Sequence, residues 1–294
     1  MNTWPLVYVI TLNWNRCDDT LRFLAFSSQL DYAHYRILVV DNGSTDNSIT
    51  AISAHFPDVE QVVNGCNLGF AAGMNVGIRY AMARGADFVF LANNDTLVAP
   101  DTLSLLVEAI LVSGASLAAP AILYTNAPQC IWSAGGWHNN VTLEITGCRR
   151  GQRAAALGHN PFEVDFVTAC GMLIRRRCLE EVGLFDERFA MYYEDMDYCL
   201  RARTAGHCVQ VVPQAKMLHD VAASIGGSNS PGERYHMALS SVLFFRKHVK
   251  GWRWFIVVPY RIGCAVKTVI RLLVAGKPRS ADAYLHGLQD GVAM

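Results

Sequence analysis

The sequence has nine cysteines but no Cys-x-x-Cys pair, and this absence narrows the class of protein. An odd set of cysteines without such pairs argues against a zinc ribbon and against the disulfide framework of a secreted protein. Residues 1–5 also lack the basic segment and the long apolar core of a signal peptide. These absences predict a protein of the reducing cytoplasm.

The sequence also lacks a net charge, because 25 basic residues balance 25 acidic ones. Attraction of the whole molecule to nucleic acid is therefore not expected, and we predict no nucleic-acid partner. The charge is unevenly distributed, since residues 246–279 contain nine Lys or Arg residues and no Asp or Glu. Aromatic and aliphatic residues fill the same stretch, a combination typical of helices that contact an anionic membrane surface.

Residues 246–294 are predicted to form a basic amphipathic helical tail rather than a membrane span. Arg261, Lys267 and Arg271 interrupt its apolar runs, and a spanning helix would bury each at a cost of roughly 2.5–3.5 kcal/mol. The preferred interpretation is a helix that lies at the inner face of the cell membrane. Packing of the tail on the protein itself, or at the interface of a homo-oligomer, is the alternative.

Apolar, β-branched runs alternate with helical patterns along the first hundred residues. The predicted strands are residues 6–12, 37–40, 62–63 and 87–92. The predicted helices are residues 20–30, 49–56 and 69–83. This alternation is typical of an α/β protein with a mostly parallel central sheet flanked by helices.

The second part of the chain carries fewer clear patterns. Residues 101–112 predict a helix, residues 117–123 a strand, and residues 194–204 a helix that ends at Gly206. Residues 124–164 have no regular pattern, and a long connection of this kind is often a binding loop.

Polar residues follow the apolar runs at the points where the predicted strands end. Asn13 follows the first run, Asp41 the second, and residues 93–95 (Asn-Asn-Asp) the fourth. Ligands bind at the carboxyl edge of the sheet in α/β proteins. Asp95 suits Mg²⁺ or Mn²⁺ bound with a diphosphate, because phosphate and water oxygens complete the octahedron. A turn or helix cap at Asp41, or a polar turn after Asp95, is the structural alternative.

Glycines four residues apart follow Asn67. Gly69, Gly73 and Gly77 share one face of the predicted helix, which permits close approach of its backbone to the sheet. Asn67 is a candidate cap of this helix, and the amides at its start can meet an anion. A Walker loop is excluded, because no Gly-Lys-Ser/Thr follows.

An acidic group at residues 194–197 begins the later helix, where carboxylates favour the helix dipole. Asp197 and Arg201 lie four residues apart and predict an ordinary helical ion pair. Asp195 has no such partner and is the better candidate for a general base. An isolated histidine such as His219 is more often structural, but a strand-end Asp and a distant His can complete one metal site.

Together these segments resemble the family 2 glycosyltransferases, which have the GT-A fold of nucleotide-diphospho-sugar transferases. The resemblance covers roughly residues 5–250 and includes the bacterial rhamnosyltransferase-like enzymes of surface-polysaccharide assembly. It rests, in this order, on Ile10–Asn15, Val40–Ser44, Asn67–Phe70, Asn93–Asp95, Gly183–Glu187 and Tyr193–Arg201. Each segment is weakly diagnostic alone, whereas their order and spacing are specific.

The resemblance implies roles for individual residues. The implied donor-binding residues are Thr11, Asn13, Asp41, Asn67, Gly69, Asn93, Asp95 and Gly171. Thr11, Asn13 and Asp41 would hold the nucleoside, with Asn67 and Gly69 near it. In the same way, Asn93 would approach the ribose and Gly171 would border the donor sugar.

The resemblance also implies a metal site and a base. Asp95 and His219 would coordinate a divalent cation, Mn²⁺ or Mg²⁺, that bridges the diphosphate. Asp195 would take the proton of the acceptor hydroxyl. Asn93 replaces the first acidic residue of the family's usual Asp-x-Asp motif, which leaves Asp95 as the carboxylate of this segment.

The implied function is an inverting sugar transfer from a nucleotide-diphosphate donor to a saccharide or lipid-linked saccharide, in cell-surface polysaccharide assembly. Rhamnose from dTDP-rhamnose is the expected sugar, and a UDP-hexose or another sugar nucleotide is the alternative. The catalytic domain is predicted at residues 1–245, with a nucleotide-binding half at 1–100 and an acceptor and catalytic half at 101–245. The tail would follow at 246–294.

The two alternative functions are a sugar-phosphate nucleotidyltransferase and a non-catalytic carbohydrate-binding or scaffolding protein. A sugar-phosphate nucleotidyltransferase would have a Gly-x-Gly-x-Arg loop after its first strand, and none follows residues 6–12. A carbohydrate-binding or scaffolding protein without turnover would have no need of both Asp95 and Asp195. Hydrolysis of a donor sugar nucleotide distinguishes the enzyme from the binding protein.

Overall fold

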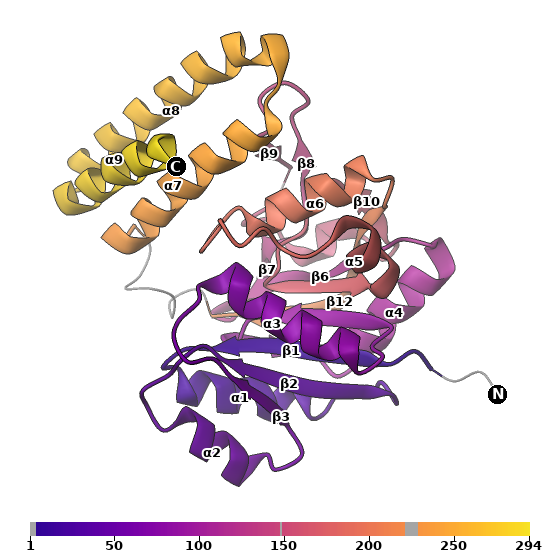
Figure 1. The fold of residues 1–294 in the computed structure, drawn as a ribbon. Helices are drawn as coiled ribbons and strands as arrows, with labels where there is room; N and C mark the ends of the chain where they lie inside the picture. The colour runs from indigo at the N-terminus through magenta and orange to yellow at the C-terminus, as the bar shows by residue number, and fades with distance from the viewer. Residues whose placement is uncertain (1–3, 148, 221–228) are drawn as a thin grey trace.

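The computed structural model describes residues 4–147, 149–220 and 229–294. Met1–Thr3, at the end where the sequence predicts no signal peptide, lie outside these residues. A large sheet with helices on both faces forms the main body, and three helices at the C-terminus pack beside it (Figure 1).

The chain forms twelve strands and nine α-helices within the described residues. The strands are β1 (Val7–Asn13), β2 (Tyr35–Asp41), β3 (Glu60–Val63), β4 (Phe88–Ala92), β5 (Thr96–Val98), β6 (Leu117–Tyr124), β7 (Ala127–Ser133), β8 (Trp137–His138), β9 (Ile145–Thr146), β10 (Phe162–Val164), β11 (Gly171–Arg175) and β12 (Val209–His219). The helices are α1 (Cys17–Ser27), α2 (Ser48–His55), α3 (Phe70–Ala83), α4 (Thr102–Ser113), α5 (Arg176–Val182), α6 (Glu194–Thr204), α7 (Pro231–His248), α8 (Trp254–Val274) and α9 (Pro278–Ala293). Two short 3₁₀ helices occupy Ala154–Leu157 and Gly251–Arg253.

The main sheet has the strand order β10-β12-β6-β11-β4-β1-β2-β3. Strands β4, β1, β2 and β3 run parallel, which confirms the α/β arrangement predicted from the first hundred residues. The second half is mixed: β11 runs antiparallel to both β4 and β6, whereas β12 is parallel to β6. The carboxyl ends of β1, β2 and β4 therefore lie at one edge of the sheet.

Apolar cores cover both faces of the sheet. Tyr8 and Ile10 of β1 belong to the core under α3, α5 and α6, whereas Val7 and Val9 belong to the core under α1, α2 and α4. Burial on both faces explains why these strands are continuous apolar runs rather than alternating ones. The packing role of the α3 glycines is confirmed at Gly77, where a Cβ atom would lie 2.6 Å from Ile10 Cγ2.

The prediction that residues 124–164 are irregular was wrong for part of this segment. Strand β7 pairs with β6 and β10 with β12, and β8 and β9 form a separate small hairpin. These strands are short and lie at edges or outside the main sheet, so their sequences need not show a buried apolar run. Apart from the 3₁₀ helix Ala154–Leu157, the other described residues of the segment are irregular.

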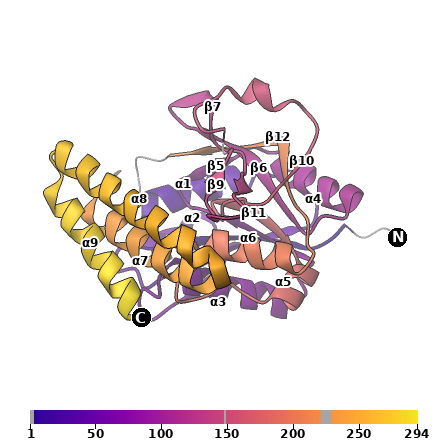
Figure 2. The same ribbon diagram turned by 90° about the horizontal axis from the view of Figure 1, so that it is seen from above.

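Helices α7, α8 and α9 form the C-terminal part. Helices α8 and α9 confirm that the predicted tail is helical. Helix α9 packs closely on α7, since a Cβ atom at Gly287 would lie 2.3 Å from the Tyr235 carbonyl oxygen. Helix α8 lies uppermost in Figure 1, and in both views the three helices occupy the side opposite the N-terminus (Figures 1 and 2). None of the helices in the described ranges combines the length and the apolar character needed to cross a bilayer.

The tail is also joined to the main body. Leu143, from the β8–β9 connection, shares a buried apolar cluster with Phe245 of α7 and Val257 of α8. Tyr260 and Arg261 of α8 both contact the Glu144 carboxylate. Helix α7 crosses the predicted domain boundary at residue 245, so the division at that point stays a prediction.

Candidate functional site

The carboxyl ends of β1 and β2 form a polar, hydrogen-bonded edge. Asn13 lies beside Asp41 in the strand register, and its Nδ2 donates to Asp41 Oδ2 at 2.8 Å. Asp41 Oδ1 accepts a bond from the Ser44 amide at 2.8 Å, so the alternative role of Asp41 in a turn is present. A carboxylate offers about four acceptor positions. These two bonds therefore leave acceptor positions of Asp41 unused.

Thr20 of α1 connects this edge to the Asn93–Asp95 segment. Its Oγ1 donates to Asn13 Oδ1 at 2.7 Å and accepts from Asn94 Nδ2 at 2.9 Å. Thr11 lies two residues before Asn13 on β1 and is fully buried. Its Oγ1 has no hydrogen-bond partner among the described residues. The structure therefore brings Thr11, Asn13 and Asp41 into one place beside the strand-end triplet.

Asn42 holds the segment that contains Asn67 and Gly69. Its Nδ2 donates to Asn67 Oδ1 at 2.9 Å and to the Gly69 carbonyl at 3.1 Å. Asn67 does not cap α3, because the residue that caps the helix is Gly69. The Gly69 amide donates to Asn67 Oδ1, and the Phe70 amide donates to the Ala190 carbonyl. These two amides are therefore already used within the protein.

Asp95 and His219 meet at the end of β12. Asp220, next to His219, donates its amide to the Asp95 carbonyl at 2.9 Å. Asp95 Oδ1 lies 3.3 Å from His219 Nε2, and both side chains are buried. Burial alone would lower the pKa of His219, but Cys170 and Asp95 beside it raise that pKa to about 10. The pairing of a strand-end Asp with a distant His, predicted from the sequence, is present in the structure.

The donor set at this point fits a hard divalent cation. It consists of the Asp95 carboxylate and the His219 imidazole. Nearby in the sequence, the buried Oδ1 of Asn93 has no hydrogen-bond partner in the described part of the chain, which suits its expected contact with the ribose. Within residues 4–147, 149–220 and 229–294, no three His, Cys, Asp or Glu side chains gather into a metal site. A cation bound here would need oxygens from a diphosphate and water, as Mg²⁺ commonly does.

Two adjacent carboxyl groups begin α6. Asp195 Oδ1 accepts from the Met196 amide at 2.8 Å, and its Oδ2 accepts from the Ala169 amide at 3.3 Å. Burial raises the pKa of Asp195. Burial and the neighbouring Asp195 together raise the pKa of Glu194 well above its ordinary value. A buried carboxyl group with a raised pKa in a ligand site is suited to accept a proton near neutral pH.

Ala169 and Cys170 connect Asp195 to the strand that carries Asn93. The Ala169 amide contacts Asp195, and the Cys170 carbonyl accepts from the Asn93 amide at 3.2 Å. Ala169 and Cys170 therefore link the candidate base, Asp195, to the segment that carries the proposed metal ligand Asp95. Gly171 follows directly, and a Cβ atom there would lie 2.8 Å from Met217 Sδ. Close packing explains this glycine, and its contact with a donor sugar stays a prediction.

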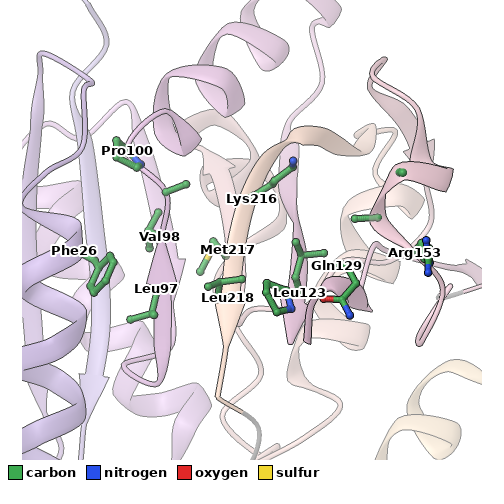
Figure 3. A pocket seen from close by; sticks show the side chains of 14 residues that line it. Phe26, Leu97, Val98, Pro100, Leu123, Gln129, Arg153, Lys216, Met217 and Leu218 are labelled. Atoms are coloured by element: carbon green, nitrogen blue, oxygen red, sulfur yellow. The ribbon is translucent and has the colours of Figure 1, made fainter. Parts of the chain in front are cut away.

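A cavity of about 620 Å³ lies beside β5 and β12 (Figure 3). Its walls are mainly apolar and include Phe26, Leu97 and Leu218, with Lys216 and Arg153 near them. None of the predicted site residues lines it. We therefore place the functional site at the carboxyl edge of the sheet and not in this cavity.

Sequence reasoning missed several residues of the site. Glu194 was interpreted as a helix-dipole residue, yet it is only 7% exposed. Asn42 has no assigned role in the sequence interpretation, although its side chain holds the Asn67 segment. Trp132 was not considered, and its ring packs edge-on against His219 with centroids 4.3 Å apart. No local pattern marks these residues, because their partners are distant in sequence.

The chain has the fold of the GT-A glycosyltransferases, as comparison with solved structures shows. The mannosyltransferase PcManGT from Pyrobaculum calidifontis, in complex with GDP-Man and Mn²⁺, matches 99% of this chain and 76% of its own with a TM-score of 0.60 at 16% identity. GalNAc-T7 with UDP, GalNAc and Mn²⁺ matches 83% of this chain with a TM-score of 0.63 at 15% identity. This chain spans half of the GalNAc-T7 chain.

The chain belongs to glycosyl transferase family 2, whose family model matches residues 8–183. It is 24% identical to the dTDP-rhamnosyl transferase RfbF of Shigella flexneri, over 82% of this chain and 80% of that protein. It is 29% identical to the N-acetylglucosaminyl-diphospho-decaprenol L-rhamnosyltransferase of Mycobacterium tuberculosis, over 83% of this chain and 86% of that protein. The resemblance to rhamnosyltransferase-like members of this family is thereby confirmed.

Proposed function

We propose that this protein transfers a sugar, with inversion, from a nucleotide diphosphate to a hydroxyl group of a saccharide or lipid-linked saccharide in cell-surface polysaccharide assembly. The observation that carries the proposal is the adjacency of two groups of opposite chemistry. Asp95 and His219 offer ligands for a cation that binds a diphosphate, and the partly buried Asp195 lies across Ala169 and Cys170 from this strand end.

The donor would lie along the carboxyl edge of the sheet. Thr11, Asn13 and Asp41 would hold the nucleoside, with Asn67 and Gly69 beside it, and Asn93 would approach the ribose. Asp95 and His219 would hold Mn²⁺ or Mg²⁺, and such a cation would stabilise the negative charge of the departing diphosphate. The presence of Mn²⁺ with a nucleotide or a nucleotide sugar in the structures of PcManGT and GalNAc-T7 supports this assignment.

Asp195 would act on the acceptor. Its carboxylate would accept the proton of the acceptor hydroxyl while that oxygen forms a bond to the anomeric carbon of the sugar. The bond from the anomeric carbon to the diphosphate oxygen breaks at the same time, so the nucleoside diphosphate leaves from the opposite face. The raised pKa of Asp195, caused by burial, makes it a stronger base than an exposed aspartate.

The rhamnosyltransferases of Shigella flexneri and Mycobacterium tuberculosis that this chain resembles favour rhamnose as the sugar. We expect dTDP-rhamnose with Mn²⁺ to raise the unfolding temperature more than UDP- or GDP-sugars do, because a ligand that binds the native state stabilises it. Thermal unfolding with each sugar nucleotide, with and without Mn²⁺, measures this. Preferential stabilisation by a UDP-hexose would assign that donor instead, and absence of stabilisation by every sugar nucleotide would contradict the donor site.

We place the protein at the inner face of the membrane, where a lipid-linked acceptor would lie. Helix α8 buries one face against the protein, with Val257 and Leu272 nearly inaccessible. The opposite face exposes Phe255, Ile262, Val266, Ile270 and Val274, between 53% and 84% of each side chain. Lys267 and Arg271 flank this stripe and line a shallow groove with its apolar residues. No acidic residue occurs in α8.

An apolar stripe beside cations is complementary to an anionic bilayer, into which such a helix can sink to the acyl boundary. In both views α8 lies on the side opposite the N-terminus, which is also the side where β1 ends at the site (Figures 1 and 2). Membrane contact through α8 would therefore bring the site near lipid-linked acceptors. An interface between two copies of the chain is the competing use of this face.

We expect the protein to float with vesicles that contain anionic lipid and to lose this binding in the Val266→Asp/Ile270→Asp variant. Burial of a Val or Ile side chain is worth about 1.5–3 kcal/mol, so the loss of two should weaken binding by about 100-fold or more. The matched control is Leu111→Asp/Val112→Asp, which changes two exposed apolar residues of α4. Failure of the unaltered protein to bind vesicles, or equal loss in the control, would contradict the membrane contact.

A further inference from the structure

A buried cluster of charges joins the last turn of α7 to the catalytic helix α6. Asp197 is completely buried, two residues after Asp195. Its carboxylate accepts bonds from Arg201 Nε at 2.8 Å, Lys247 Nζ at 2.6 Å and His248 Nε2 at 2.7 Å. The sequence predicts only the pair with Arg201, which is confirmed, because Lys247 and His248 are some fifty residues away. We call these four residues the Asp197 cluster.

The charge of Asp197 is maintained by its partners. Burial opposes ionisation, but His248, Lys247 and Arg201 hold the pKa of Asp197 below its ordinary value. A buried charge is tolerated only when it is paired and hydrogen-bonded. The cluster therefore constrains the relative position of α6 and α7, since separating them would leave the carboxylate without two of its donors.

Lys247 also holds the segment that leads into α6. Its Nζ lies 2.7 Å from Asp186 Oδ2, and Asp186 in turn pairs with Arg188. Two turns earlier in α7, Ser240 Oγ donates to the Met191 carbonyl at 2.7 Å. One helix of the C-terminal part thus contacts the start, the middle and the end of residues 186–197, which include Asp195.

The segment needs such support because its backbone is strained. Tyr192 and Tyr193 have φ angles of 66° and 68°. Left-handed backbone at a residue other than glycine costs of order 1–3 kcal/mol and persists only where surrounding structure holds it. The Tyr193 ring packs on Phe244 of α7, with centroids 5.4 Å apart. These two residues immediately precede Glu194 and Asp195. Relaxation of their backbone would therefore change the orientation of the first turn of α6 and of the Asp195 side chain in it.

We propose that Lys247 and His248 are positioning residues, which hold Asp195 toward the acceptor by fixing the buried Asp197 of the same helical turn. Asp195 faces Ala169 at the sheet edge, whereas Asp197 faces α7. A misplacement of about 1 Å in a catalytic group can lower turnover by about 100-fold. Most of the proposed donor-binding residues lie at the ends of β1, β2 and β4, outside residues 186–197, so the donor affinity should be largely retained when these residues are changed.

The test compares the variants Lys247→Met and His248→Leu, each of which leaves Asp197 two of its three donors. We expect each to lower kcat by about 10–100-fold with unchanged donor affinity in calorimetry, and Lys247→Arg and His248→Gln to recover most of the loss. Arg246→Met is the matched control: Arg246 occupies the same turn of α7 but donates to the Gly291 and Val292 carbonyls of α9. Its kcat should stay near that of the unaltered enzyme.

Hydrogen exchange supplies a second measurement that does not depend on activity. The Asp197 amide donates to the Tyr193 carbonyl at 2.8 Å in the first turn of α6. We expect this amide to exchange faster in Lys247→Met and His248→Leu, and not in Arg246→Met. Unchanged exchange and kcat in both variants would overturn the proposal. Parallel loss of donor binding and kcat would also overturn it, because the effect would then be on the whole domain.

The inference rests on the proposed role of Asp195 as the base, and the two can fail separately. If Asp195→Asn retained turnover while exchange at Asp197 still rose in Lys247→Met, the proposed base would be wrong and the support of α6 by α7 would stand. If Asp195→Asn lost turnover and the α7 variants did not, only the positioning role would be wrong.

Discussion

Replacement of Asp195 by Asn is expected to lower kcat for sugar transfer by about 10²- to 10⁴-fold, the contribution typical of a general base. Asn keeps the size of the side chain, and its single carbonyl oxygen can still accept a bond from the Met196 amide, the shorter of the two contacts of Asp195, so the fold and the donor affinity should be largely retained. Steady-state kinetics with an acceptor, together with calorimetry of donor binding, separates the two effects. Near-normal transfer by a folded variant would remove Asp195 from this role.

Glu194→Gln is the matched control for that variant. The pKa of Glu194 is raised well above its ordinary value by burial and by Asp195, which favours the neutral form of its carboxyl group. Glutamine resembles a protonated glutamic acid in shape and in neutral charge. We expect Glu194→Gln to keep most of the activity, whereas a loss equal to that of Asp195→Asn would show that both carboxyl groups take part.

The pH dependence of the reaction follows from the same burial. Asp195 accepts a proton only when it is ionised, and its raised pKa means that the proton is lost at a higher pH than in an exposed aspartate. The value of kcat/KM should therefore fall as the pH decreases through the raised pKa, with the acidic limb above the ordinary range for Asp. An acidic limb at or below that range would contradict the assignment.

Replacement of Asp95 by Ala is expected to abolish metal-dependent donor binding. Loss of an outer-shell partner of a metal site costs about 10- to 100-fold in affinity, and loss of the ligating carboxylate should cost at least as much. Isothermal titration of the donor in the presence and absence of Mn²⁺ measures the effect. The removal of Mn²⁺ by a chelator should weaken donor binding in the unaltered protein and have little further effect in Asp95→Ala.

Asp220→Ala provides the control for this titration. Asp220 directly follows the other proposed ligand, His219, but its carboxylate lies 3.7 Å from Arg22 and is 40% exposed. Its loss should leave the affinity for Mn²⁺ and donor nearly unchanged. Equal affinities in the unaltered protein and in Asp95→Ala would refute the role of Asp95 as a metal ligand.

Much of the nucleotide-binding half could be predicted from local sequence. The strands ending at Asn13, Asp41 and Ala92 are apolar because both faces of the sheet are covered. Polar residues follow them at the edge of the sheet near which α1, α2 and α3 begin. The pairing of Asp95 with His219 was also foreseen, although through the family resemblance and not through spacing. The assigned roles of Thr11, Asn13, Asp41, Asn67, Gly69 and Gly171 stay predictions.

Other parts of the site could not be predicted, since they depend on contacts between distant segments. Glu194 has the sequence signature of an exposed helix start, and only the packing around α6 makes it a buried acid. Asp197 has one partner within its own helix, and the other two come from the end of α7. A local pattern cannot report either fact.

By itself, the sequence determined the order of strands and helices from β1 to β4 and the polar residues at the ends of these strands. Hydrophobic periodicity and turn residues act within a few positions of one another, so they are readable without a structure. Only the tertiary structure decided that β11 enters the sheet antiparallel and that α7 supports the helix of the proposed base. Those features arise from pairing and burial between segments far apart in the chain, and the burial that raises the pKa of Asp195 is set there as well.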